Sequence, residues 1–148
     1  MRFVRVLLLL WATTLPALSQ TALPAGWRLV HDSKSPSVQV DLNGDGLIDK
    51  AVLATDGNST KAFAFLAEKD GEYRIMELME SREEPAECGL ELLPPDRYVT
   101  ACGKGLVECN EMPKEVVTKV PTLSFSDQNV MVMFLFQGHD LHRIWLTD

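Results

Sequence analysis

Residues 41–49 carry the side chains of this chain that are best suited to metal chemistry. Their sequence is Asp-Leu-Asn-Gly-Asp-Gly-Leu-Ile-Asp, so oxygen-bearing side chains stand at positions 1, 3, 5 and 9 of the segment. This spacing lets a tight loop wrap one hard cation. Ca²⁺ suits it better than Mg²⁺, which resists dehydration, or Zn²⁺, which prefers nitrogen and sulfur. The predicted ligands are Asp41, Asn43 and Asp45, the carbonyl of Leu47, and Asp49 directly or through water.

Other residues of the segment favour a wound loop between two strands. Gly44 and Gly46 permit the left-handed backbone that winding requires, and Ile48 is expected to anchor the loop to the core. The segment differs from an EF-hand because Val52, rather than Glu, stands at position 12. Its flanks also have the pattern of strands rather than helices, so a helix-loop-helix sensor is not expected.

The alternative to a metal site is a solvated turn in which the Asp and Asn side chains bond their own backbone. Four oxygen positions with a glycine in register favour calcium, in a structural rather than a catalytic role. An affinity typical of extracellular modules, about 0.1–1 mM, is expected. At about 1 mM Ca²⁺ this affinity contributes about 0.4–1.4 kcal/mol, enough to order a loop but not to drive the whole fold.

Residues 40–54 resemble the calcium loops of FG-GAP and VCBS repeats, in which the same Asp-x-Asn-x-Asp-Gly-x-x-Asp run joins two strands. The resemblance implies a strand, a calcium loop and a strand. It does not imply a β-propeller, because one copy cannot form the usual four or more blades. Other segments are similar to small exported bacterial proteins that carry one such loop and have no assigned activity, which implies a Gram-negative periplasm. These segments are residues 94–98, 101–105, Cys109 and residues 143–148.

Three cysteines, Cys88, Cys102 and Cys109, predict one disulfide and one remaining thiol in an oxidising compartment. Cys102 with Cys109 is the preferred pair, because the six residues between them are enough to turn back and include two glycines. Cys88 with Cys102 is the main alternative. Metal binding by the thiols lacks paired ligand spacing, and a catalytic cysteine lacks an identifiable base.

The remaining polar residues give no catalytic motif. His139 and His142, with Asp140, could bind a transition metal near the last hairpin, but a polar turn accounts for them equally well. His31 is the third histidine. The chain has neither a nucleophile elbow nor a glycine-rich phosphate loop, and the glutamates between residues 77 and 87 are expected to form a solvated face. No catalytic residue is therefore predicted.

Short apolar runs with a period of two, separated by turn residues, predict an all-β chain. An antiparallel meander folded as a sandwich or a partly open barrel is expected, with little helix. Residues 130–136 are a continuous apolar run, so they should form a central strand buried on both faces, and residues 75–84 offer the one helical alternative. The expected strands are residues 37–42, 51–55, 62–66, 73–79, 89–93, 98–102, 115–120, 122–126, 130–136 and 141–146.

The beginning of the chain has the pattern of a secretory signal peptide. Two arginines precede the apolar run Val6–Trp11, and small residues follow it. Cleavage is expected between Ser19 and Gln20, leaving residues 20–148 as a single β domain. This predicts a periplasmic or secreted protein.

The charge balance limits the partners. The chain of 148 residues is 46% hydrophobic and 24% charged, which excludes a disordered acidic tail. Without residues 1–19 it carries 12 basic and 21 acidic side chains, a net charge of −9. This excess argues against sequence-independent binding to nucleic acid or anionic lipid. No second apolar stretch approaches the roughly 18 residues that span a bilayer.

These observations predict a non-enzymatic exported domain, held by one Ca²⁺ and one disulfide, that acts through protein or envelope interaction. An inhibitor or immunity factor against a basic wall-active enzyme fits the charge. The alternative is a calcium-dependent cell-wall hydrolase, which requires two convergent carboxylates in a pocket, or Cys88 beside a histidine. A calcium sensor is disfavoured by the short, strand-flanked loop.

Overall fold

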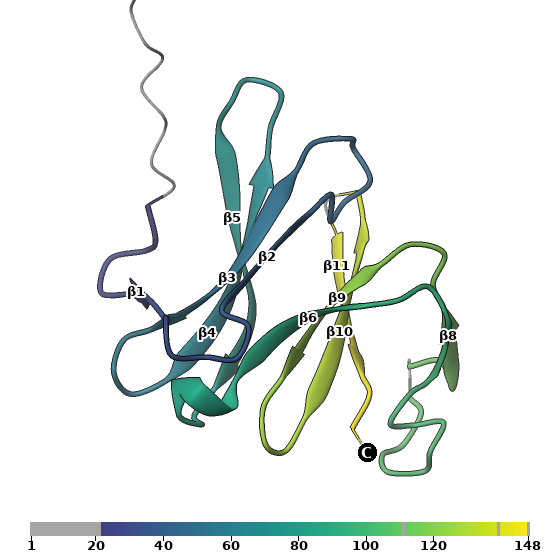
Figure 1. Ribbon diagram of the computed structural model, residues 1–148. Coiled ribbons are helices and arrows are strands. Elements are labelled where there is room, and N and C mark those ends of the chain that lie inside the picture. The colour runs from purple at the N-terminus through teal and green to yellow at the C-terminus, as the bar shows by residue number, and fades with distance from the viewer. Residues whose placement is uncertain (1–21, 111, 139, 148) are drawn as a thin grey trace, which may run out of the picture.

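The computed structural model of the chain describes residues 22–110, 112–138 and 140–147. The expected signal peptide with its cleavage site lies outside the described residues, and so does His139. Within the described ranges the chain forms two antiparallel sheets, a separate two-stranded ribbon and one turn of 3₁₀ helix (Figure 1). The all-β prediction is therefore confirmed. The two sheets face each other as a sandwich and do not close into a barrel.

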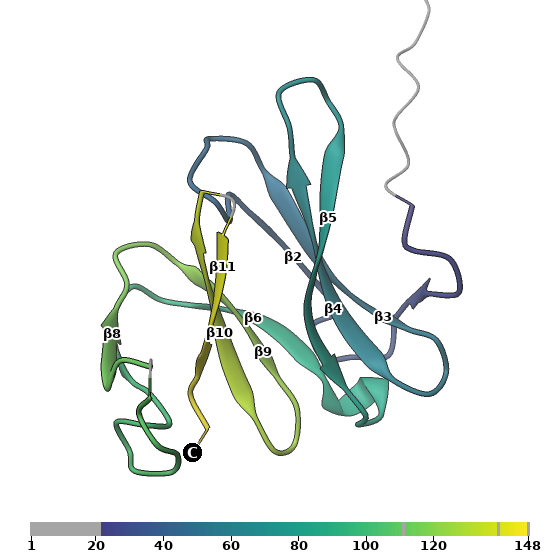
Figure 2. The same ribbon diagram turned by 180° about the vertical axis from the view of Figure 1, so that it is seen from behind.

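Sheet A contains the strands that flank the Asp41–Asp49 loop. Its strand order is β1-β3-β4-β5, and β2 pairs with the same edge of β3 as β1 but nearer the beginning of that strand. The β4–β5 hairpin extends well beyond the rest of the sheet (Figure 2). The strands are β1 (Arg28–Leu29), β2 (Ser37–Val40), β3 (Asp49–Thr55), β4 (Thr60–Ala67) and β5 (Tyr73–Ser81).

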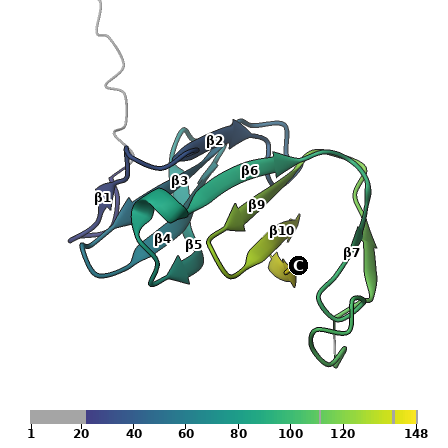
Figure 3. The same ribbon diagram turned by 60° about the horizontal axis from the view of Figure 1, so that its bottom comes forward.

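Sheet B has the strand order β11-β10-β9-β6. The 3₁₀ helix η1 (Pro85–Glu87) links β5 of sheet A to β6, which runs along sheet B and leads into the ribbon β7–β8 (Figure 3). The strands of sheet B and the ribbon are β6 (Gly89–Leu93), β7 (Arg97–Val99), β8 (Glu115–Val117), β9 (Thr122–Ser126), β10 (Met131–Gln137) and β11 (Asp140–Trp145).

Alternation along the strands divides the apolar side chains into three clusters. The main cluster lies between the sheets. Its members include Leu53 and Leu66 from sheet A, and Phe125 and Phe134 from sheet B. A second cluster lies on the outer face of sheet A under Trp27, and a third lies between sheet B and the β7–β8 ribbon. Val132, Met133 and Phe134 are all buried, so β10 is covered on both faces, as its continuous apolar run predicts.

The β4–β5 hairpin shows how turn chemistry sets the register. Gly71 has a φ of +87°, and its N–H donates to the Glu68 carbonyl at 2.9 Å. The Asp70 side chain accepts a hydrogen bond from the Glu72 N–H at 3.0 Å. This is a three-residue turn with its last residue left-handed, a conformation that glycine adopts at little cost. The strand prediction for residues 73–79 is confirmed, and the helical alternative is wrong.

Several boundaries differ from the sequence-based expectation. The segment predicted as a strand over residues 98–102 pairs only as far as Val99, because the Thr100 hydroxyl accepts a bond from the Gly103 N–H and closes a turn. The strand expected over residues 115–120 ends at Val117. No helix of the described ranges is both long enough and apolar enough to cross a bilayer.

Candidate functional site

The Asp41 carboxylate organises the first half of the loop between β2 and β3. Its Oδ1 accepts hydrogen bonds from the N–H groups of Gly44 at 2.7 Å and Asp45 at 3.2 Å. Its Oδ2 accepts a bond from the Gly46 N–H at 2.8 Å. Gly44 and Gly46 have φ values of +77° and +86°, so both adopt the left-handed conformation expected from the sequence. The backbone therefore winds around Asp41.

Asn43 and Asp45 continue this winding. The Asp45 N–H donates to Asn43 Oδ1 at 3.0 Å, and Asn43 Nδ2 donates to Asp45 Oδ2 at 3.1 Å. The Leu47 N–H then donates to Asp45 Oδ1 at 2.8 Å. The structure thus brings Asn43 and Asp45 into direct contact on the exposed side of the loop. The Leu47 carbonyl remains a predicted ligand.

Asp49 differs from the other aspartates of the loop because it is fully buried. Its Oδ2 accepts a bond from the Leu42 N–H, and its Oδ1 accepts one from the Ala67 N–H, both at 2.8 Å. Burial is the main cause that raises the pKa of this carboxyl, against the two hydrogen bonds, and the Asp45 and Asp41 charges raise it further. Asp49 therefore ties the β2–β3 loop to the end of β4, a role that the sequence does not reveal.

The prediction that Ile48 anchors the loop to the core is wrong. Ile48 is 62% exposed, whereas Leu42, at the other end of the loop, packs against the main core cluster. The reason is the register of β3. Because Asp49 points inward with Ala51, Ile48 falls on the outer face of sheet A with Lys50.

The oxygen atoms of the loop match the donor type that Ca²⁺ prefers. Each carboxylate oxygen has two lone pairs, so accepting one N–H leaves capacity for a cation. Burial is the main cause of the raised pKa of Asp49, and the charges of Asp45 and Asp41 add a smaller contribution, which a bound cation would offset. Within the described ranges, no three His, Cys, Asp or Glu side chains are arranged as a ready metal-binding group. A bound ion therefore requires the Asn43 and backbone oxygens as well as the carboxylates.

Two surface cavities flank the loop, which lies where the two sheets approach each other (Figure 1). One, of about 360 Å³, lies between Asn43, Asp45 and the β4–β5 turn. The other, of about 330 Å³, lies between residues 41–44 and the apolar residues of β10 and the β8–β9 connection. The conformation of the loop therefore shapes both cavities.

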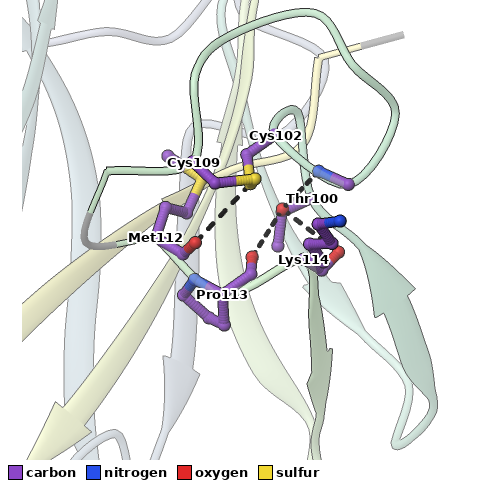
Figure 4. The surroundings of a disulfide bond; sticks show 7 residues. Thr100, Cys102, Cys109, Met112, Pro113 and Lys114 are labelled. Carbon is purple, nitrogen blue, oxygen red and sulfur yellow. Dashed lines mark hydrogen bonds between the residues drawn. A yellow bond between two sulfur atoms is a disulfide. The ribbon is translucent and has the colours of Figure 1, made fainter.

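The disulfide prediction is confirmed, since Cys102 and Cys109 are bonded with their Cα atoms 4.9 Å apart. Figure 4 shows this bridge beside Met112, whose carbonyl lies 3.5 Å from Cys102 Sγ. The Thr100 hydroxyl donates to the Pro113 carbonyl at 2.7 Å, and the Ala101 N–H donates to the Trp145 carbonyl at 2.8 Å. The residues that lead into the bridged loop are therefore bonded both to the segment just before β8 and to the end of β11.

Cys88 is the free thiol among the described residues, and it is 1% exposed. Burial chiefly raises the pKa of this thiol above its usual 9.0, and the Asp127 and Glu83 charges add to the effect, against hydrogen bonds from Ser81 and Thr60. A thiol that is both enclosed and harder to ionise is a poor nucleophile. Cys88 therefore packs within the main core cluster.

This environment predicts a pH dependence of stability. Just above pH 9.0 the unfolded thiol ionises while the folded thiol does not. The folded state then binds more protons, and the free energy of unfolding falls as pH rises, by at most about 1.4 kcal/mol per pH unit. Urea unfolding at about pH 8 and about pH 10 should show this decrease for the parent. Cys88→Ala should show a shallower one, and equal slopes for the two proteins would contradict the assignment.

Among the described residues, the glutamates between residues 77 and 87 that have polar partners contact Lys61 and Asn129. Glu77 and Glu80 pair with Lys61 at 2.9 Å and 3.3 Å, while Glu83 accepts a bond from Asn129. Of the predicted histidine cluster, the described His142 lines a cavity of about 590 Å³ beside the disulfide loop.

Arg143 has a structural role that the sequence does not signal. Its Nε donates to the Leu78 carbonyl at 2.6 Å, and its Nη2 donates to the Glu77 carbonyl at 3.1 Å. It thereby joins β11 of sheet B to the edge strand β5 of sheet A. A lone arginine in an amphipathic strand carries no pattern that distinguishes this role from a solvated position.

Comparison of the chain with protein-family models, with curated proteins and with solved structures found no match.

Proposed function

We propose that the protein is a calcium-stabilised, non-enzymatic β-sandwich domain that acts in the bacterial envelope by binding another protein. The observation that carries the calcium part is the wound Asp41–Asp49 loop, in which backbone N–H groups hold the Asp41 carboxylate and Asn43 contacts Asp45. The left-handed Gly44 and Gly46 give the loop the wound backbone that the predicted ligand spacing needs. The resemblance to FG-GAP and VCBS loops supports the same ion.

Calcium acts on structure in this proposal. Its ligands lie on the segment that joins β2 to β3, and Asp49 links that segment to Ala67 at the end of β4. Binding of Ca²⁺ neutralises two of the loop's three negative charges. It also holds the loop in one conformation, and the loop forms one wall of each neighbouring cavity. The expected gain of about 0.4–1.4 kcal/mol orders this end of the sandwich without being needed for folding.

Thermal unfolding of residues 20–148 tests the calcium part. At about 1 mM Ca²⁺ the melting temperature of the parent should rise by about 2–6 °C relative to EDTA, and Mg²⁺ at the same concentration should give a smaller rise. Asp45→Ala should remove this calcium response, because it removes a proposed ligand. The variant should still fold, since Asp45 is exposed and its loss leaves the core unchanged. Asp56→Ala is the matched control, since Asp56 caps a different exposed turn through the Asn58 and Ser59 N–H groups. An equal calcium response in the parent and Asp45→Ala would overturn the site.

The protein partner is inferred from charge. A net charge of −9 without residues 1–19 favours a basic surface, such as that of a wall-active enzyme, and an inhibitor or immunity factor is the form of function that this suggests. Recovery of such an enzyme from a periplasmic extract in calcium, and its loss in EDTA, would support the proposal. Recovery of no specific protein under either condition would count against it. A cell-wall hydrolase gains no support from Cys88, whose thiol is enclosed.

A further inference from the structure

An open cavity lined by six apolar side chains and Lys50 lies on the outer face of sheet A, away from the calcium loop's own cavities. It has a volume of about 510 Å³, within the range of small-molecule sites. Its apolar walls come from the segment before β3 and from the sheet itself, and one charged residue, Lys50, completes them. The apolar lining residues are Ala22, Leu23, Trp27, Leu29, Val52 and Phe65.

Strand register explains how Lys50 comes to lie in this cavity. Lys50 is paired with Phe65 across β3 and β4, and it precedes Val52 by two residues on the same strand. All three side chains therefore point to the same face of the sheet. Trp27 covers this face and packs edge-on against Phe63, with ring centroids 5.5 Å apart. Lys50 is thus a cation set among aliphatic and aromatic groups.

Lys50 also has no partner for its charge within residues 22–110, 112–138 and 140–147. Among the described residues it makes no ion pair and no side-chain hydrogen bond, although the chain has 21 acidic side chains for 14 basic ones. The neighbouring cation Lys61 differs, because it is neutralised by Glu77 at 2.9 Å and Glu80 at 3.3 Å while lying 5.0 Å from the Trp27 ring. The sheet face therefore leaves one positive charge unsatisfied at the edge of an apolar cavity.

Apolar surface continues on this face beyond the cavity. Ile48, which precedes Lys50 by two residues, is 62% exposed. Ile75, which is paired with Phe65 on the neighbouring strand, is 40% exposed. Apolar surface that remains exposed in this way commonly marks a binding site.

From this geometry we infer a binding site for a singly charged amphiphile, a fatty-acid-like carboxylate whose head pairs with Lys50 and whose unbranched chain lies against Trp27, Val52 and Phe65. One cation matches one negative charge, which favours a monocarboxylate over a multiply charged anion. The apolar walls favour a hydrocarbon chain over a polar metabolite. The site goes beyond the proposed calcium-dependent function and uses none of the predicted calcium ligands.

Trp27 provides the readout. In residues 20–148, Trp27 and Trp145 are the two tryptophans, so a Trp145→Phe background reports on Trp27 alone. Decanoate, added below the concentration at which it forms micelles, should give a saturable change in Trp27 emission. Lys50→Met keeps most of the aliphatic stem but removes the charge, and it should weaken decanoate binding about tenfold or more. Decanol should bind the parent about as weakly as decanoate binds Lys50→Met.

Lys119→Met is the matched control, because Lys119 is an exposed lysine that does not line this cavity, and it should change decanoate affinity less than about twofold. Three outcomes would overturn the site: no saturable change with decanoate, equal decanoate affinity in Lys50→Met and the parent, or equal affinity for decanol. A Trp27 spectrum that changes with protein concentration in the absence of decanoate would instead assign this face to a second copy of the chain. Titrations in Ca²⁺ and in EDTA should agree, so failure here is distinguishable from failure of the calcium proposal.

Discussion

Asp49→Ala should lower the free energy of unfolding by about 2–6 kcal/mol when measured in EDTA. The substitution leaves the N–H groups of Leu42 and Ala67 without the acceptors that they contact at 2.8 Å. Each unsatisfied buried donor costs about 1–3 kcal/mol. Asp49→Asn should lie between the parent and Asp49→Ala, because the amide keeps one acceptor oxygen and turns the other position into a donor. Urea unfolding monitored by circular dichroism measures the three values.

Asp56→Ala is the matched control for this loss. Asp56 also accepts two backbone N–H bonds, at 2.8 Å and 2.9 Å, but its turn is exposed and water can replace the lost acceptor. Its loss of stability should therefore be much smaller. If Asp49→Ala and Asp56→Ala destabilised the protein equally in EDTA, the buried link between the loop and β4 would be refuted.

Removing the disulfide should have the next largest effect. Cys102→Ser combined with Cys109→Ser should lower the free energy of unfolding by about 2–3 kcal/mol, because a short closed loop restricts the unfolded chain by about that amount in the chain-entropy model. The parent treated with a reductant should behave like the double variant. Cys88→Ser keeps the bridge, so a reductant should destabilise this variant by the same amount as the parent.

Amide hydrogen exchange should show which strands lose stability when the disulfide is removed. The residues just before the bridged loop are bonded to β11 through the Ala101 N–H and, through the Thr100 hydroxyl, to Pro113, which precedes β8 of the ribbon. Loss of the bridge should therefore speed exchange in the ribbon more than in β4 or β10. Unchanged unfolding midpoints after complete reduction would contradict a stabilising role.

Most strands could be predicted from the sequence because alternation and turn residues mark them clearly. β6 and β9 match their expected residues, since prolines and turns limit both. Two short elements could not be predicted. β1 has two residues, too few to show a period, and η1 is a single 3₁₀ turn that begins at Pro85. The Cys102–Cys109 pair was predictable because its geometry is local.

The candidate site was predictable only in part. The left-handed glycines and the contacts among the first three oxygen-bearing residues follow from local spacing. The burial of Asp49 does not, because its second partner, Ala67, lies 18 residues away and is placed by the register of β3 with β4. The same register exposes Ile48 and turns Lys50 toward the outer cavity. Patterns along one segment cannot supply such long-range pairings.

Calorimetric titration of Ca²⁺ into residues 20–148 tests the calcium site most directly. We expect one site with a Kd of about 0.1–1 mM in the parent and in Asp56→Ala, and no binding heat in Asp45→Ala. Absence of heat from the parent at millimolar Ca²⁺, or equal binding by Asp45→Ala, would show that the loop is a hydrogen-bonded turn and not a calcium site.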